Sequence, residues 1–242
     1  MKMVDSDMVE SVTCNDECVD KNALELPHQH KSSDIQDLLK AHNEEPRLKP
    51  QIRLPGISEI FPSLYLCGAG VAIPVFLEKI GITCVINAAP ELPNTPLPLD
   101  ANGSTPVYLQ VPVLDKSDIN IAEYFDQVSD LIERTRQTNG KTMVHCIAGV
   151  SRSATLVLAY LMKYMNISLK DAYEFVRAAR PQIRPNTSFV RQLIAYEEKL
   201  FKKTTVAMIF KESLGCEVPD IYETEYKALE IFYKKHRHLK LR

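Results

Sequence analysis

The sequence TMVHCIAGVSRSATLVLAYLMKYM, residues 142–165, combines a short apolar strand, a loop of mostly small residues and a helix that is apolar nearly all round. We expect the strand over 142–146 and the buried helix over 153–165. Between them, the peptide N–H groups of residues 147–152 can curl into a concave nest. The first helical turn adds its unsatisfied donors and positive dipole end. Such a cup suits a tetrahedral dianion.

The same loop carries side chains suited to chemistry on a bound phosphate. Gly149 permits backbone torsions that a residue with a Cβ resists. Arg152 can return to the rim and grip two phosphate oxygens with its planar fork, which a lysine could not reproduce. Cys146 lies at the bottom among amides, a helix N-terminus and an arginine, so we expect a nucleophilic thiolate at neutral pH. The predicted phosphate-binding residues are Ile147, Ala148, Gly149, Val150, Ser151 and Arg152.

Hydrolysis of a phosphate monoester also needs a group that protonates the leaving oxygen. An apolar strand predicted over 107–114 ends at Asp115, and we expect this carboxyl to act as general acid and later as base on water. Asp118 is the rival for this role and Asp100 a remote third, although a solvated loop position or a helix cap is the more ordinary role for Asp118. Ser153 can donate a hydrogen bond to the sulfur, cap the helix, or do both.

Strands and helices alternate along the chain, which indicates an α/β fold with a central mixed sheet flanked by helices. The predicted strands are two short ones within 57–68, one over 82–88 and one over 107–114, besides that at 142–146. The predicted helices cover 73–81, Asn120 to Thr138 behind a capping box with Glu123, Ser168 to Arg180 behind one with Asp171, and 188–203, besides that at 153–165. The loop 90–98 and residues 180–186 are expected to frame the pocket.

Composition limits the classes of function. The 242 residues are 45% apolar and 25% charged, and a net charge of −2 does not indicate a broad electrostatic grip on nucleic acid. No apolar stretch reaches the ~20 residues that span a bilayer, so we expect no stable membrane insertion. The N-terminus has no apolar signal region, so we expect a cytoplasmic location, with the nucleus as a second one. Six irregularly spaced cysteines favour free thiols over a disulfide framework.

Charge and pattern divide the chain into three parts. Residues 1–50 carry 11 acidic and 6 basic side chains with little apolar periodicity, and we expect a largely disordered acidic arm. Residues 51–203 are expected to form a single catalytic domain. The extension 204–242 has a less regular pattern and ends in the basic run KKHRHLKLR.

Cys84 raises the question of redox protection. It lies in the predicted strand 82–88, which could neighbour the strand that ends at Cys146. An ionised Cys146 is prone to oxidation, and a neighbouring thiol could trap it as a reversible disulfide. The alternative is that Cys84 is a small buried hydrophobe.

Several motifs together resemble those of one enzyme family. They are VPVLD (111–115), HCIAGVSRSAT (145–155), AYLMK (159–163) and RPQIRPNTSFVRQLIAYE (180–197). The sequence is similar over about residues 55–203 to the dual-specificity protein phosphatases of the cysteine-dependent protein tyrosine phosphatase superfamily. The resemblance is closest to the small atypical members that lack a rhodanese-like docking domain.

The resemblance implies the single-domain cysteine-phosphatase fold and a role for each matching residue. Its counterparts here are Cys146 as nucleophile, Arg152 as phosphate clamp, Asp115 as acid and base, Ser153 as the hydroxyl that assists thiolate release, and Asn87 and Asn186 as structural supports. From its place beside the nucleophile, we expect His145 to tether the loop rather than carry a proton. Turnover is expected without a metal or another cofactor.

The resemblance also implies phosphoprotein substrates, with phosphate on tyrosine and on serine or threonine, MAP kinases among them. A phosphoinositide phosphatase is one alternative, but inositol-specific relatives usually place lysines where this loop has Ile147, Ala148 and Val150. A non-catalytic phosphoprotein-binding module is another, although such proteins typically lose the cysteine or the arginine. A rhodanese-type sulfurtransferase would not require Asp115.

Overall fold

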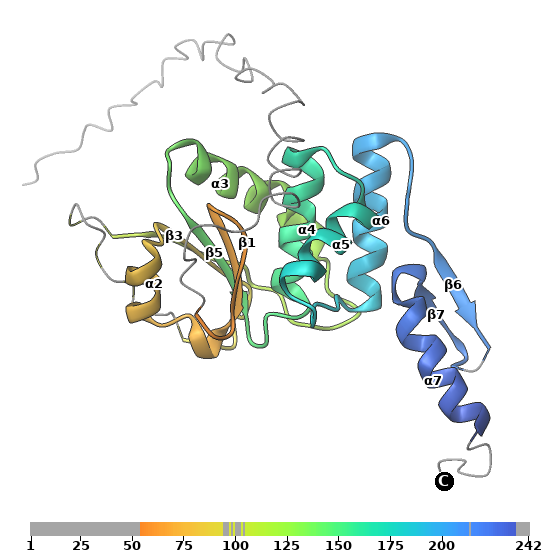
Figure 1. Cartoon of the computed structure of the whole chain (residues 1–242). Coiled ribbons are helices and arrows are strands. Elements are labelled where there is room, and N and C mark those ends of the chain that lie inside the picture. Colours follow the sequence, from red (N-terminus) through yellow and green to blue (C-terminus); the bar gives the residue numbers. More distant parts are fainter. Residues whose placement is uncertain are drawn as a thin grey trace, which may run out of the picture.

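A computed structural model describes residues 54–93, 97, 99, 103, 105–212 and 214–235. The arm predicted at 1–50 and most of the basic run at the C-terminus lie outside these residues. A central sheet separates a single short helix from a group of longer helices, and the C-terminal extension lies beyond that group (Figure 1).

The central sheet has five strands in the order β1-β2-β5-β3-β4. Their bounds are β1 Ile57–Phe61, β2 Leu64–Gly68, β3 Cys84–Asn87, β4 Val107–Gln110 and β5 Thr142–Cys146. Strands β1 and β2 are antiparallel and all other pairs are parallel, which confirms the predicted mixed sheet. All residues of β5 are buried, because it lies in the middle of a sheet covered on both faces.

The longer helices cover one face of the sheet and a short helix covers the other (Figure 1). On the first face lie α3 (Phe125–Gln137), α4 (Arg152–Met165), α5 (Leu169–Ala179) and α6 (Thr187–Phe201). Helix α4 confirms the predicted buried helix, with 12 of its 14 residues buried. No helix in the described part of the chain is long and apolar enough to cross a membrane.

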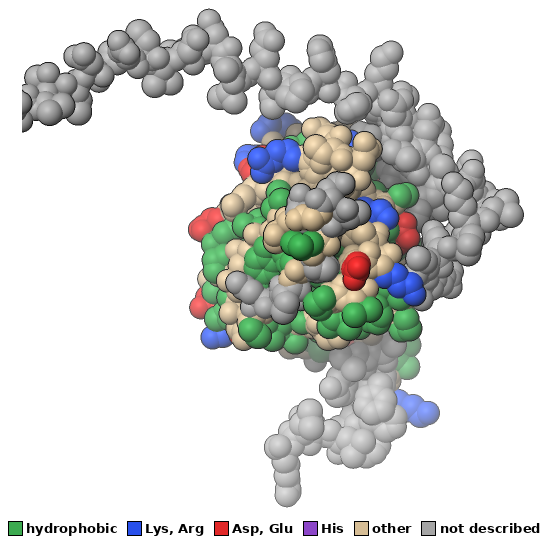
Figure 2. Space-filling view, turned by 90° about the vertical axis from the view of Figure 1, so that its left-hand side faces the viewer, with side chains coloured by type: hydrophobic (Ala, Val, Ile, Leu, Met, Phe, Trp, Pro, Cys, Tyr) green, Lys and Arg blue, Asp and Glu red, His purple; other side chains and the backbone are tan. Residues whose placement is uncertain are grey.

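On the opposite face, η1 (Ala69–Val71) and α2 (Pro74–Ile80) leave part of the apolar surface uncovered. Leu77 of α2 packs in one cluster with Val85 and Met143 of the sheet. Hydrophobic side chains gather on this side of the molecule (Figure 2). The exposed ones include Ile73 and Val75. The apolar surface on this side is therefore only partly buried.

Two predicted capping boxes have different outcomes. At Ser168 the prediction is confirmed, because its Oγ accepts a hydrogen bond from the N–H of Asp171 at 3.1 Å. At Asn120 it is wrong, since the Asn120 amide donates to the Glu123 carboxylate at 2.7 Å and caps no backbone group. A 3-10 turn, η2 (Ile121–Tyr124), precedes α3 there, so the α-helix begins later than predicted.

The strand predicted over 107–114 is wrong beyond Gln110, where β4 ends. Val111 still donates its N–H to the Asn87 carbonyl at 2.8 Å. The next residue, Pro112, has no N–H with which to continue the pairing. The chain therefore leaves the sheet and carries Asp115 to the pocket beyond β5.

The C-terminal extension is more regular than its sequence predicts. β6 (Met208–Lys211) and β7 (Cys216–Pro219) form an antiparallel hairpin, followed by η3 (Asp220–Tyr222) and α7 (Glu223–Lys235). Two hydrogen bonds of 2.7 Å anchor it: Thr205 Oγ1 donates to the buried Glu197 carboxylate, and Tyr222 OH donates to the Pro185 carbonyl. Strands of only four residues give too little alternation to be recognised in the sequence.

Candidate active site

The candidate site begins where the central strand ends. Cys146 is the last residue of β5 and is 2% exposed, and α4 begins at Arg152. Gly68 of β2 and Asn87 of β3 pair in register with Cys146 and His145, so the two neighbouring strands end beside the loop 147–151. Parallel strands thus bring their carboxyl ends together around the cysteine.

The buried guanidinium of Arg180 fixes the back of the loop. Its Nε donates to the carbonyl of Gly149 at 2.7 Å and its Nη2 to the carbonyl of Ala148 at 3.1 Å. A third bond, from Nη1 to the carbonyl of Gly56 at 3.0 Å, ties the same side chain to the start of the domain. Arg180 was not among the individual residues predicted for the site, although the segment 180–186 was.

The remaining loop carbonyls are also held from outside. The N–H of Ala69 donates to the Ile147 carbonyl at 3.0 Å, and the N–H of Arg184 donates to the Val150 carbonyl at 2.9 Å. The Ser151 carbonyl receives the N–H of Thr155 within α4. In a trans peptide the N–H points opposite to the carbonyl, so the N–H groups of residues 148–152 face away from these donors. This arrangement of the backbone is compatible with the amide cup expected for the loop, which stays a prediction.

Gly149 is required at its position for two reasons. Its φ of +67° lies in the left-handed region that favours glycine. A Cβ placed there would lie 2.4 Å from the carbonyl carbon and oxygen of Cys67, on the neighbouring strand. No side chain fits between β2 and the loop, so the close approach depends on glycine.

Two donors point at the sulfur of Cys146. The N–H of Gly149 lies 3.3 Å from Sγ, and the hydroxyl of Ser153 lies 3.1 Å from it. Both interactions are strongest when the sulfur carries negative charge. Of the two roles considered for Ser153, the structure supports donation to sulfur, because the N-cap residue of α4 is Ser151.

The guanidinium of Arg152 is oriented by Glu91, a residue that the sequence did not single out. Nη1 and Nη2 donate to the two carboxylate oxygens of Glu91 at 2.9 and 2.8 Å, and Nη1 also donates to the Val113 carbonyl at 3.1 Å. The hydrogen bond from Arg152 lowers the pKa of Glu91. The buried Nε has no hydrogen-bond partner among the described residues. Nε–H and the second N–H of Nη2 lie on one edge of the guanidinium, which is the edge that can bind two phosphate oxygens.

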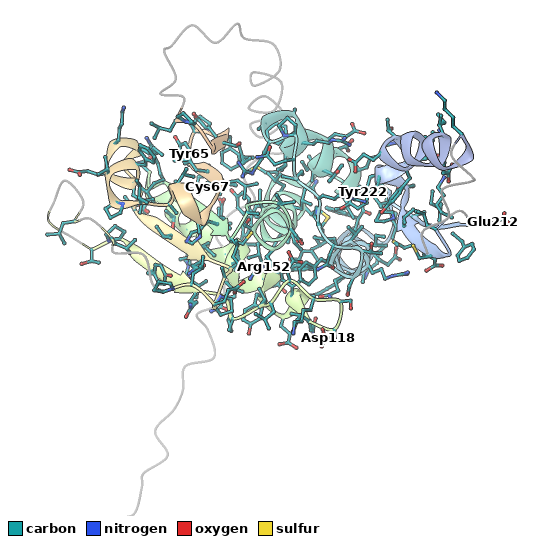
Figure 3. The ribbon with its side chains drawn as sticks, turned by 90° about the horizontal axis from the view of Figure 1, so that it is seen from below. Tyr65, Cys67, Asp118, Arg152, Glu212 and Tyr222 are labelled. Atoms are coloured by element: carbon teal, nitrogen blue, oxygen red, sulfur yellow. The ribbon has the colours of Figure 1, made fainter. Side chains whose placement is uncertain are left out.

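Asp115 lies in the same pocket and is held by two neighbours. The Ser151 hydroxyl and the Asn186 side-chain amide both donate to Oδ1, at 2.9 and 2.7 Å. The side-chain oxygen of Asn186 accepts the N–H of Phe189 and caps α6, so one side chain links the helix to the carboxylate. Asp118 is exposed and does not line this pocket (Figure 3), and Asp100 lies outside the described residues.

The two remaining predicted supports behave differently. Asn87 accepts the N–H of Ala89 at 2.8 Å and donates to the Tyr108 hydroxyl, so it shapes the segment that leads to Glu91. His145 is buried beside Cys146 at the end of β5, and its tethering role stays a prediction. Burial lowers the pKa of His145, which keeps it neutral, and packing in the centre of the sheet holds it.

Cys146, Arg152, Asp115 and part of the loop between β5 and α4 line one pocket of about 380 Å³. Its lining residues are Asp115, Cys146, Ile147, Ala148, Val150, Ser151, Arg152, Arg184 and Asn186. Figure 3 shows Arg152 inside the ribbon near the start of α4. In the described part of the chain, no cluster of three His, Cys, Asp or Glu side chains is placed to hold a metal ion. The pocket brings the loop backbone, the Cys146 thiol and the Asp115 carboxyl group together in one cavity.

The proposed disulfide between Cys84 and Cys146 is excluded by strand register. Cys84 pairs with Thr142, four residues before Cys146 on the adjacent strand. At about 3.3 Å per residue this offset separates the two by more than 13 Å, whereas a disulfide requires Cα atoms within about 7 Å. Cys84 is a buried hydrophobe whose thiol pKa is raised by burial.

A thiol below an amide cup, with a guanidinium beside it on an α/β sheet, defines a cysteine-dependent phosphatase. Comparison with known proteins identifies the group within this class. Residues 64–199, more than half of the chain, match the family model described as "Dual specificity phosphatase, catalytic domain". The chain belongs to the dual-specificity phosphatase family and is a dual-specificity protein phosphatase.

Individual relatives are similar in sequence to this chain over most of their own length. Dual specificity protein phosphatase 14 of Bos taurus is 46% identical over 185 residues, which cover 76% of this chain and 89% of the relative. Dual specificity protein phosphatase 18 of Homo sapiens is 43% identical over 183 residues, covering 74% and 93%. The crystal structure of human DUSP28 is similar with a TM-score of 0.53 and 30% identity, over 61% of this chain and 97% of that one.

Proposed function

We propose that this phosphatase hydrolyses phosphate monoesters on proteins through a phosphocysteine at Cys146, with Arg152 and Asp115 as its partners. The observation that carries the proposal is the unoccupied edge of Arg152. Its buried Nε–H has no hydrogen-bond partner in the described part of the chain, while Glu91 and Val113 accept from both N–H groups of Nη1 and from one N–H of Nη2. An unsatisfied buried donor is costly, so this edge is suited to receive a ligand's oxygens.

In the first step, the N–H groups of residues 148–152 and the free edge of Arg152 bind the non-bridging phosphate oxygens. The sulfur of Cys146 attacks phosphorus while the bond from phosphorus to the leaving oxygen breaks. Asp115 transfers its proton to that oxygen. Both hydrogen bonds that orient Asp115 reach Oδ1, so Oδ2 is the oxygen available to carry the proton.

In the second step, water attacks phosphorus and the bond from phosphorus to sulfur breaks. The carboxylate of Asp115 accepts the proton of the water, and the thiolate of Cys146 is the leaving group. The hydroxyl of Ser153 and the N–H of Gly149 point at this sulfur and stabilise the charge that returns to it. Inorganic phosphate then leaves the cup.

Protein substrates fit the side chains of the loop better than phosphoinositides do. Ile147, Ala148 and Val150 contribute no cation to the pocket, whereas a polyphosphorylated headgroup needs several. Phosphotyrosine and phosphoserine or phosphothreonine are the proposed target residues, and MAP kinases are proposed among the targets. Residues 51–203 are proposed as the catalytic unit, and a cytoplasmic and nuclear location stays a prediction.

The test uses the purified full-length chain and three substrates: a phosphotyrosine peptide, a phosphothreonine peptide and a short-chain phosphoinositide. We expect release of phosphate from both peptides at higher kcat/KM than from the lipid. Cys146→Ser should abolish turnover but still bind phosphopeptide, because the cup and Arg152 remain. The matched control is Cys84→Ser, which removes another buried thiol outside the pocket. Preference for the lipid, or turnover by Cys146→Ser, would overturn the proposal.

A further inference from the structure

The hairpin of the C-terminal extension has one strand edge that no other described strand covers. The small sheet contains only β6 and β7, so β6 pairs on one side and has an open edge on the other. In Figure 1 β6 runs along the outer margin of the extension, with β7 and α7 on its inner side. An open edge is a template for pairing with a further strand.

The backbone groups at this edge belong to Met208 and Phe210. The N–H of Asp220 donates to the Ala207 carbonyl at 2.9 Å, so these two residues form a hydrogen-bonded pair between the strands. Hydrogen-bonded residues alternate along an antiparallel strand, and therefore Met208 and Phe210 direct their N–H and C=O groups away from β7. Pro219, which lies opposite Met208, has no N–H and fits this alternation. Within the described part of the chain, these outward groups have no hydrogen-bond partner.

The open edge of β6 also lacks the features that usually keep an edge strand from pairing. Such strands are protected by proline, by a bulge or by outward charged side chains. In the central sheet, the edge strand β1 has a register shift between Glu59 and Phe61, and Pro112 follows the edge strand β4. The register of β6 is regular, and residues 206–210, VAMIF, contain neither proline nor charge.

The side chains beside the open edge are apolar. Phe210 is 63% exposed, and Met208 points to the same face of the hairpin because it is two residues away on the strand. Lys211 points to the opposite face, where its amino group lies 3.9 and 3.8 Å from Glu223 and Glu230 of α7. The one charged side chain of β6 thus contacts the extension itself and does not protect the edge.

The two ends of β6 carry opposite charge. Lys202 and Lys203 precede the strand and are exposed, and Glu212 follows it at the outer end of the extension (Figure 3). Neither Lys203 nor Glu212 has an ion-pair partner among the described residues. Antiparallel pairing of two copies of β6 would bring the positive end of each strand toward the negative end of the other. The charges therefore favour a second copy of this chain as the partner of the edge.

We propose that β6 pairs with β6 of a second copy in an antiparallel arrangement with twofold symmetry. The axis passes beside Ile209, so that Met208 of each copy lies opposite Phe210 of the other, and each of these pairs exchanges two N–H···O=C bonds. Thioether and ring pack against each other across the axis. Twofold pairing uses each open edge once, so the assembly closes at two copies. The interface includes no residue of the pocket, so it goes beyond the proposed function.

The experiment is sedimentation equilibrium of the purified full-length chain from about 1 to about 200 µM, since an interface of this size is weak. We expect an equilibrium between monomer and dimer with no larger species. A chain that stays monomeric over the whole range, or one that forms larger assemblies, would overturn the proposal. Hydrolysis plays no part in this measurement, so failure of the proposed function would leave its result unchanged.

The decisive variant is Phe210→Lys, which places a charge at the open edge. The dimer dissociation constant should rise about a hundredfold, because the symmetric interface contains the residue twice and each loss costs about tenfold. The Tm at a concentration where the wild-type chain is monomeric should not change, which shows that the variant folds. Val75→Lys is the matched control, since Val75 is 65% exposed and lies on α2, away from the extension (Figure 1).

Two further variants test the backbone bonds and the direction of the strands. Met208→Pro removes an N–H at the open edge but none that faces β7, so it should also weaken the dimer. Glu212→Lys should raise the dissociation constant about threefold to tenfold, the range of two exposed ion pairs, and Lys203→Glu added to it should restore the wild-type value. A dimer that withstands both Phe210→Lys and Met208→Pro, or a charge reversal that is not restored, would overturn this arrangement.

Discussion

The carboxylate of Glu91 accepts hydrogen bonds from both terminal nitrogens of Arg152, at 2.9 and 2.8 Å, although the two residues are 61 positions apart in the sequence. This contact leaves the adjacent edge of the guanidinium, formed by Nε–H and the second N–H of Nη2, as the proposed binding edge. Glu91 therefore acts on the substrate through Arg152, as a positioning residue.

Replacement of Glu91 by glutamine should lower kcat/KM by about tenfold, because one of two charge-assisted bonds to Arg152 is lost. The measurement is steady-state hydrolysis of a phosphopeptide, together with the dissociation constant of inorganic phosphate. Glu78→Gln, an exposed change on α2, is the control. Unchanged phosphate affinity in Glu91→Gln would show that Arg152 needs no such support.

The role of Asp115 can be separated from that of Asp118 by the leaving group. Asp115→Asn should reduce kcat/KM for phosphopeptides by roughly a hundredfold or more, as expected for loss of a general acid. The kcat/KM for an aryl phosphate with an acidic leaving group should fall much less, because formation of the phosphocysteine then needs no proton. Asp118→Asn, outside the pocket, should leave both rates near the wild-type values. The opposite pattern would transfer the role to Asp118.

Arg180 is expected to maintain the amide cup. Arg180→Lys keeps the charge but cannot reach the carbonyls of Ala148 and Gly149 with one planar group. We predict a fall of about 1–3 kcal/mol in the free energy of unfolding and a marked loss of phosphate affinity. Chemical denaturation and calorimetric titration with phosphate measure these two effects. A variant with full phosphate affinity would show that the loop holds its shape without Arg180.

Stability at low pH should depend on Asp126. Hydrogen bonds from Lys163 and Tyr196 lower the pKa of Asp126 from 3.8 to about 2. A folded-state pKa below the unfolded value means that the carboxylate stabilises the fold above about pH 4, and that this stabilisation disappears as the pH falls through about 2. Asp126→Asn should therefore lower the Tm at pH 7, and the difference from wild type should shrink toward pH 2. A difference that is constant with pH would contradict this assignment, and Asp118→Asn serves as the control.

Local pattern was sufficient to predict the strand, loop and helix around Cys146, since their periodicity and the small loop residues are contiguous. It also predicted Asp115, which follows an apolar stretch, as a partner of this loop, and Asp115 lines the same pocket as Cys146. Glu91 and Arg180 could not be singled out in this way. Their partners lie 61 and 31 residues away, and a charged residue in a loop carries no local sign of what it contacts.

Other differences between the predictions from the sequence and the structure have similar physical causes. The order of the C-terminal extension depends on buried contacts such as Tyr222 with Pro185, which the weak periodicity of residues 204–235 does not reveal. The predicted capping box at Asn120 failed because two polar side chains bonded to each other instead of to the backbone. The disulfide suggested between Cys84 and Cys146 is wrong. Their strands are neighbours, as predicted, but the register of a strand pair cannot be predicted from one strand, and it places Cys84 opposite Thr142.

The most direct test of the account is capture of the covalent intermediate. Asp115→Asn, given an aryl phosphate and quenched in acid during turnover, should accumulate enzyme carrying one phosphoryl group, because the base for the second step is missing. Peptide mass mapping should place that group on Cys146, and Cys146→Ser should carry none. A phosphoryl group on another residue, or turnover with no labelled enzyme at any quench time, would contradict the mechanism.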